Sequence, residues 1–192
     1  ERAVPVPVSD YGETKLEAEK YVMQLPQTMR KTVLRAPVVY GKNDSGVSKI
    51  AAWVARGIMV NTSSSEMFFN FIYVEDLVSA LYKASLLQEA DGQTFFVCEP
   101  AGYSWKYFIN SMADAMGKPR PLMFNMPYFV LEAAAFVYES AARVFSITPA
   151  LNYDKIKEAA IKGHWVCSSQ KWVSLTGQQF TPLAEGLKKS FQ

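Results

Sequence analysis

The sequence predicts an α/β protein in which helices pack against a parallel sheet. Apolar segments of strand length alternate along the chain with amphipathic segments of helical length, which is the pattern of successive βα units. Of the 192 residues, 49% are hydrophobic and 20% are charged, as in an ordinary folded domain. The formal net charge is only +2, and no run of Lys or Arg is present, so we expect no nucleic-acid partner.

The first expected element is a helix from about Tyr11 to Leu25. Asp10 has a side chain suited to the N-cap, and Glu13, three residues further on, completes the pattern of a capping box. The preceding VPVPV segment is expected to stay extended, because alternating prolines prevent helix formation.

Strands and helices then alternate along the rest of the chain. The expected strands are apolar segments flanked by turn residues, at 32–36, 67–74, 93–97 and 121–127. The expected helices have apolar residues at helical spacing, at 47–59, 76–87, 104–116, 128–145, 153–161 and 182–191. Asp76 and Ser104 are the expected N-caps of two of these helices. The expected turns and loops are PVVYG after the first strand and the polar segments 42–46 and 61–66.

The segment from Met126 to Ile147 is broadly apolar and raises the question of a membrane. Its charges, Glu132, Glu139 and Arg143, recur at spacings of seven and four residues and therefore share one stripe of a helix. Three charges argue against a membrane-spanning helix. Packing in the core, a homodimer contact and a membrane-surface contact remain as alternatives.

Cysteine and histidine usage indicates neither a disulfide framework nor a metal site. Cys98 and Cys167 lie far apart in the sequence without a CxxC pattern, so we expect two free thiols in a reducing compartment. His164 is the only histidine, so we expect no metal. Because the opening residues also contain no signal peptide, we expect a cytoplasmic protein.

A tyrosine and a lysine lie one turn apart at the start of the first helix. Tyr11 and Lys15 would lie on one helix face, where the ammonium would favour the phenolate and make the tyrosine a usable acid–base group. The same spacing occurs in Tyr153 and Lys157, which we assign to a solvated helix face. The spacing alone therefore does not identify a catalytic pair.

The residues around the first pair are more specific. The segments are SDYGETKLEAE at 9–19, LRAPVVYG at 34–41, NFIYVEDL at 70–77, WVCSSQK at 165–171 and LAEGL at 183–187. In this order they resemble the active-site helix and later motifs of the extended short-chain dehydrogenase/reductases, which include NAD-dependent epimerases and dehydratases. The second segment departs from the family pattern because Ala36 is inserted before the proline.

This resemblance implies a role for several residues. Tyr11 would be the catalytic acid–base group, and Lys15 would assist it and bind the nicotinamide ribose of NAD or NADP. The other residues implied to face the cofactor are Pro37, Val38 and Val39. Those implied to face a small-molecule substrate are Tyr40, Asn61 and Met67, although a plain surface loop explains the last two equally well.

The glycine-rich loop that binds a dinucleotide pyrophosphate is not found in this sequence, where the ten glycines are dispersed. The family places that loop, and a catalytic Ser or Thr, before the tyrosine helix. We therefore expect this chain to be the C-terminal portion of a longer enzyme and to need the N-terminal half as its partner. Residues 1–100 would end the Rossmann domain, with 43–66 inserted toward the substrate, and 101–192 would form a smaller, mainly helical substrate lobe.

The resemblance predicts hydride transfer to or from a secondary alcohol or ketone. The substrate would be a nucleotide sugar, or a hydroxysteroid or dihydroflavonol, and the apolar segment from Met126 favours the second group. We expect the isolated chain to be inactive. The alternative is a non-catalytic protein that senses NAD(P) with the same fold, which the retained Tyr11 and Lys15 disfavour.

Overall fold

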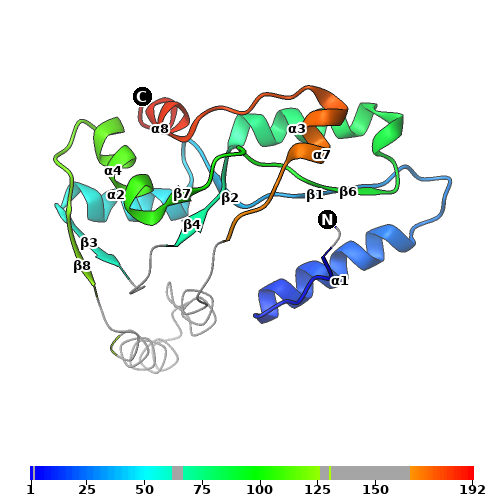
Figure 1. Ribbon diagram of the computed structural model, residues 1–192, viewed down its shortest axis with the longest axis horizontal. Helices are drawn as coiled ribbons and strands as arrows, with labels where there is room; N and C mark the ends of the chain where they lie inside the picture. Colours follow the sequence, from blue (N-terminus) through cyan, green and yellow to red (C-terminus); the bar gives the residue numbers. More distant parts are fainter. Residues whose placement is uncertain (2, 62–66, 126–129, 131–164) are drawn as a thin grey trace.

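A computed structural model describes residues 1, 3–61, 67–125, 130 and 165–192. It shows an α/β arrangement with three parallel strand pairs and one antiparallel pair (Figure 1). Of the predicted elements, the helices at 128–145 and 153–161 lie outside the described residues, apart from Val130.

The first parallel pair is covered by helices on both faces. It consists of β1 (Thr32–Arg35) and β6 (Gln93–Phe96), with Thr32 opposite Gln93 and Arg35 opposite Phe96. Helix α1 (Asp10–Gln24) lies on one side, and helices α3 (Val74–Leu86) and α7 (Gln170–Thr176) lie on the other (Figure 1). A short 3-10 turn, η1 (Gln88–Ala90), leads from α3 toward β6. This helix–sheet–helix layering is what the βα pattern predicted.

The remaining strands form three further two-stranded sheets. The pairs are β2 (Val38–Tyr40) with β5 (Phe71–Tyr73), β3 (Ile58–Asn61) with β8 (Leu122–Asn125), and β4 (Phe68–Phe69) with β7 (Tyr103–Ser104), of which only the last is antiparallel. The helices are α2 (Ser45–Ala55), α4 (Trp105–Ala115) and α8 (Leu183–Phe191).

Three local predictions were wrong in their details. Residues 38–40 form strand β2 rather than a turn, because each pairs with a residue of β5. The helix predicted at 47–59 ends at Ala55, since Gly57 adopts φ +77°, a left-handed conformation that stops a helix and lets β3 begin. Helix α7 was not predicted, because its seven residues are too few for a clear periodic pattern.

Two of the predicted N-caps also changed. Ser9, not Asp10, caps α1, since its hydroxyl accepts the Gly12 N–H at 3.2 Å. Asp76 caps no helix; its carboxylate accepts hydrogen bonds from the backbone N–H of Thr181 at 2.6 Å and from the Thr181 hydroxyl at 3.2 Å. It therefore anchors the C-terminal segment. Ser104 caps α4 as predicted, accepting the Tyr107 N–H.

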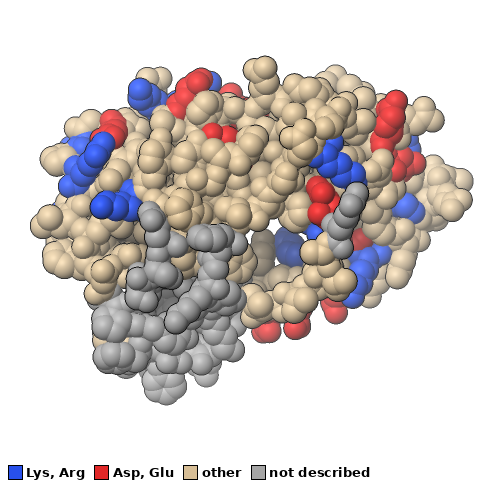
Figure 2. Space-filling view, viewed as in Figure 1, with Lys and Arg blue, Asp and Glu red and all other residues tan. Residues whose placement is uncertain are grey.

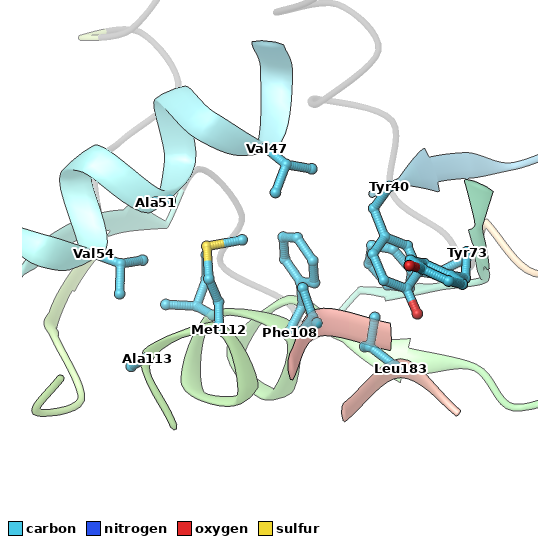
Figure 3. Close-up of a cluster of buried hydrophobic side chains, with 12 residues drawn as sticks. Tyr40, Val47, Ala51, Val54, Tyr73, Phe108, Met112, Ala113 and Leu183 are labelled. Atoms are coloured by element: carbon cyan, nitrogen blue, oxygen red, sulfur yellow. The ribbon is translucent and has the colours of Figure 1, made fainter. Parts of the chain in front are cut away.

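Two hydrophobic clusters form the core, and each contains residues from both sides of residue 100. The larger cluster joins β2, α2, β5, α4 and α8, and Figure 3 shows Val47, Tyr40, Phe108 and Leu183 converging within it. In the smaller cluster, Trp172 of α7 packs edge-to-face on Phe95 of β6. Both clusters therefore cross the predicted domain boundary at residue 100, which stays a prediction.

The apolar segment from Met126 to Ile147 lies outside the described residues, apart from Val130. Within the described ranges, no helix combines the length and apolarity that spanning a bilayer requires.

Candidate active site

The start of α1 is set by the side chain of Ser9. Ser9 has extended backbone angles, and its hydroxyl satisfies one of the free N–H groups of the first turn. Thr14, within this turn, donates its hydroxyl to the Tyr11 carbonyl at 2.8 Å. Tyr11 therefore lies in the first turn, and Lys15 follows one turn later.

The structure brings Tyr11 and Lys15 together. The Lys15 Nζ lies 5.4 Å from the centroid of the Tyr11 ring, within the range of a cation–π contact. Tyr11 is 66% exposed, and Lys15 is also exposed, so the phenol is accessible to a reactant. The predicted juxtaposition of a phenol and an ammonium is thus present, while its catalytic role remains a prediction.

A cleft of about 350 Å³ lies beside this pair, between α1, the extended N-terminal segment and the end of β1. Its polar lining comes from Glu1, Lys15, Glu19 and Arg35, and Pro5 and Pro7 contribute apolar surface. Of the pair, Lys15 lines this cleft and Tyr11 does not. In Figure 2 the visible face is hollowed next to α1, with Lys or Arg side chains exposed there.

An ion pair at the wall of the cleft fixes α1 to the sheet. The Glu19 carboxylate accepts hydrogen bonds from Arg35 Nε at 2.9 and 3.2 Å and from Arg35 Nη2 at 2.6 Å. About three quarters of each side chain is buried, and the bond to Glu19 raises the pKa of Arg35. The Arg35 guanidinium also lies 5.6 Å from the Phe96 ring centroid.

Sequence reasoning did not identify Glu19. The available signal was spacing, because Tyr11, Lys15 and Glu19 recur every four residues and therefore share one helix face. That face carries both the candidate catalytic pair and the anchor to β1.

The predicted cofactor-facing residues other than Lys15 lie on or next to β2. Pro37 precedes the strand, Val38 is 43% exposed, and Val39 is half-buried and packs on the smaller core cluster. None of the three lines the cleft at Lys15. Their contact with a cofactor therefore stays a prediction.

The predicted substrate-facing residues are less accessible than expected. Tyr40 is only 1% exposed, and its ring centroid lies 5.7 Å from that of Tyr73. Figure 3 shows these two rings next to each other. Met67 is 7% exposed. Asn61, at the end of β3, donates its side-chain amide to Asn125 at 3.0 Å. Direct substrate contact needs accessible atoms, so only Asn61 of the three is placed for it here.

Charged side chains elsewhere are dispersed. The visible face in Figure 2 carries both signs of charge without a single large patch. In the part of the chain that the structure describes, no three His, Cys, Asp or Glu side chains converge as a metal site would require. His164 lies outside the described residues.

The model of the 3-beta hydroxysteroid dehydrogenase/isomerase family matches residues 1–128. A search of curated protein sequences found no match.

Solved structures share the fold at low sequence identity. UDP-glucuronic acid 4-epimerase from Bacillus cereus, in complex with UDP-glucuronic acid and NAD, is 17% identical with a TM-score of 0.68, and the alignment covers 100% of this chain and 54% of that one. UDP-glucose 4-epimerase from Thermotoga maritima, with UDP-glucose, is 20% identical with a TM-score of 0.67 and coverages of 98% and 54%. RMD from Pseudomonas aeruginosa, complexed with NADPH, is 16% identical with a TM-score of 0.70 and coverages of 100% and 57%.

These similarities confirm the predicted α/β fold class with its Rossmann-like parallel sheet. The chain spans only 53% to 58% of the length of the matched structures.

Proposed function

The chain belongs to the 3-beta hydroxysteroid dehydrogenase/isomerase family, and on that premise we propose that it carries the acid–base pair of an NAD(P)-dependent enzyme. The reaction would interconvert a secondary alcohol and its ketone. The single observation that carries this proposal is the position of Lys15, which lines the cleft and holds its ammonium 5.4 Å from the centroid of the Tyr11 ring.

Tyr11 would move the proton of the substrate hydroxyl. Its exposed phenol can reach a substrate hydroxyl without rearrangement of the core, and a positioned side chain of this kind typically accelerates a reaction about 10²- to 10⁴-fold. Lys15 would stabilise the phenolate that forms when Tyr11 gives up its proton, because the ammonium lies beside the ring. The Glu19–Arg35 ion pair would keep this helix face at a constant distance from the end of β1.

The residues around the cleft fit one end of a nicotinamide dinucleotide. An ammonium at the wall of a cleft of about 350 Å³ suits the hydroxyl groups of a ribose. The pyrophosphate end needs a glycine-rich turn at a helix N-terminus, and among the described residues none lines this cleft. When bound, the nicotinamide would accept or donate the hydride, and Lys15 would hold its ribose.

We assign the substrate to the hydroxysteroid-like class rather than to the nucleotide sugars. The family match supports this choice. The two epimerase structures described above contain UDP-sugars, but they are at most 20% identical to this chain, so the similarity extends to the fold alone. Asn61 is proposed to contact the substrate. The buried Tyr40 and Met67 would instead support the substrate site through packing contacts.

The proposed activity belongs to a protein longer than this chain. The matched structures are nearly twice as long, and the groups that would bind the pyrophosphate are not in this sequence. We therefore propose that residues 1–192 work together with an N-terminal dinucleotide-binding segment and that alone they turn over no substrate.

Steady-state assays on the intact protein test this function. Oxidation of a 3β-hydroxysteroid should produce reduced nicotinamide, followed by its absorbance, while a UDP-sugar should give no turnover. Turnover of the UDP-sugar alone would contradict the substrate assignment. Binding of nicotinamide cofactor without turnover of either substrate would favour the non-catalytic sensor.

A further inference from the structure

Two cysteines far apart in the sequence meet at the end of β6. Cys98 Sγ and Cys167 Sγ are 3.6 Å apart although 69 residues separate them along the chain. Both thiols are free. A disulfide requires about 2.05 Å between the sulfur atoms, so the two sulfurs would have to approach each other by about 1.5 Å to form one.

The two thiols differ in access. Cys98 is fully buried, whereas Cys167 is only partly buried. The contact with Cys98 lowers the pKa of the Cys167 thiol, while the same contact and burial raise the pKa of Cys98. A thiolate is the reactive form of cysteine, so the accessible sulfur is also the better nucleophile.

A buried amide holds the two segments at this spacing. Asn70 is 1% exposed, and its Oδ1 accepts the Cys167 N–H at 2.6 Å. Its Nδ2 donates to the carbonyls of Glu99 at 2.9 Å and Ala101 at 3.1 Å, just after Cys98. Asn70 therefore ties the backbone of both cysteine-bearing segments to one side chain, independently of the sulfur contact.

We propose that Cys98 and Cys167 form a thiol–disulfide exchange site that a small-molecule disulfide, such as oxidised glutathione, converts to an intramolecular disulfide. The Cys167 thiolate attacks one sulfur of the oxidant, forms a mixed disulfide and releases one thiolate. Cys98 then gives up its proton and attacks Cys167 Sγ, which releases the second thiol. Two protein thiols are oxidised, and one small disulfide is reduced to two thiols.

The bond would join the segment after β6 to the segment before α7. It closes a loop that contains every residue from 99 to 166, and a loop of that length restricts the unfolded chain strongly. The oxidised protein should therefore unfold at a higher temperature than the reduced protein. This proposal does not depend on the proposed enzyme activity.

Mass spectrometry of the intact protein tests the site. The reduced protein is incubated with oxidised glutathione, and remaining thiols are blocked with N-ethylmaleimide. The expected product is one cross-linked peptide pair that joins Cys98 to Cys167, with two hydrogen atoms lost and no glutathione or N-ethylmaleimide adduct on either residue. Separate glutathione adducts on both cysteines, or full N-ethylmaleimide labelling of the folded protein, would overturn the proposal.

Single variants separate the two roles. Cys98→Ala should stop at a stable glutathione adduct on Cys167, whereas Cys167→Ala should stay unmodified while folded. Equal reactivity of the two variants would contradict the assignment of Cys167 as the attacking thiol. Asn70→Ala, with folding checked by circular dichroism, should accumulate the mixed disulfide because ring closure slows; closure at the wild-type rate would count against the positioning by Asn70.

Discussion

Arg35, the last residue of β1, holds the Glu19 carboxylate of α1 through Nε and Nη2 at 2.6 to 3.2 Å. Planar, two-pronged contacts of this kind restrict orientation as well as distance. Because Glu19 is one turn beyond Lys15 and two turns beyond Tyr11, the ion pair determines where that helix face lies relative to the sheet.

Removal of Arg35 should weaken this attachment. Arg35→Met leaves a carboxylate that is three quarters buried without its partner, so the free energy of unfolding should fall by about 1–3 kcal/mol. The matched control is Arg120→Met, since Arg120 pairs with Asp114 while both side chains are more than half exposed. Urea unfolding measures the loss in the free energy of unfolding for both variants. Equal losses would show that the partly buried pair with Glu19 contributes no more to stability than the exposed pair.

Glu99 should make stability depend on pH. It is 8% exposed, and burial raises the pKa of its carboxyl above the ordinary 4.5, against the bonds from Tyr103 and the Leu183 N–H, which lower it. The folded protein then holds this proton more tightly than the unfolded chain. Stability should therefore fall as pH rises from about the ordinary value through the raised pKa.

Urea unfolding at a series of pH values measures the slope of the free energy of unfolding against pH. Glu99→Gln should flatten it, because the titrating group is gone. Tyr103→Phe should move it to higher pH, because one hydrogen bond that favours the carboxylate is lost. A wild-type slope that Glu99→Gln leaves unchanged would rule out Glu99 as its source.

Gly186 should not tolerate a methyl group. A Cβ there would lie 2.2 Å from the Tyr40 hydroxyl, so Gly186→Ala should lower the free energy of unfolding by about 1–3 kcal/mol despite the better helix propensity of alanine. Among the described residues that hydroxyl has no hydrogen-bond partner. Tyr40→Phe should therefore be near neutral alone and should recover only part of the loss in Gly186→Ala, because two ring carbons of residue 40 would still lie 2.8 and 2.9 Å from the new Cβ. Additive effects of the two changes in urea unfolding would contradict the close contact.

Lys15 should contribute to both cofactor binding and turnover. Lys15→Met removes the ammonium beside Tyr11 and should reduce kcat/KM in the intact protein by about 100-fold. Lys20→Met, an exposed lysine on the same helix, is the control and should change little. Similar losses in both variants, in steady-state assays, would indicate a general effect of charge.

Much of the fold follows from local patterns. Helix α4 is N-capped by Ser104 and ends near Gly117, which has φ +63°. The local sequence pattern was therefore enough to predict this helix. The division of residues 67–74 into β4 and β5 could not be predicted, because the break at Asn70 depends on hydrogen bonds to Glu99, Ala101 and Cys167. Contacts between distant segments leave no local signal.

The candidate site likewise combines features that local patterns predict with features that depend on distant contacts. The helical spacing of Tyr11 and Lys15 predicted that their side chains would meet, and they do. The burial of Tyr40 depends on α8, which arrives more than a hundred residues later and places Gly186 against the Tyr40 ring. Likewise, nothing in the sequence around Cys98 indicated that Cys167 would lie 3.6 Å away.

The most direct measurement compares Tyr11→Phe with Tyr21→Phe in the intact protein, using the rate of nicotinamide reduction by a hydroxysteroid. Both tyrosines lie on α1 and are 66% and 72% exposed, so the two substitutions remove equally accessible hydroxyls. Tyr11→Phe should lower the rate by about 10²- to 10⁴-fold, and Tyr21→Phe should leave it unchanged. An unchanged rate in Tyr11→Phe would contradict the assignment of Tyr11 as the proton carrier.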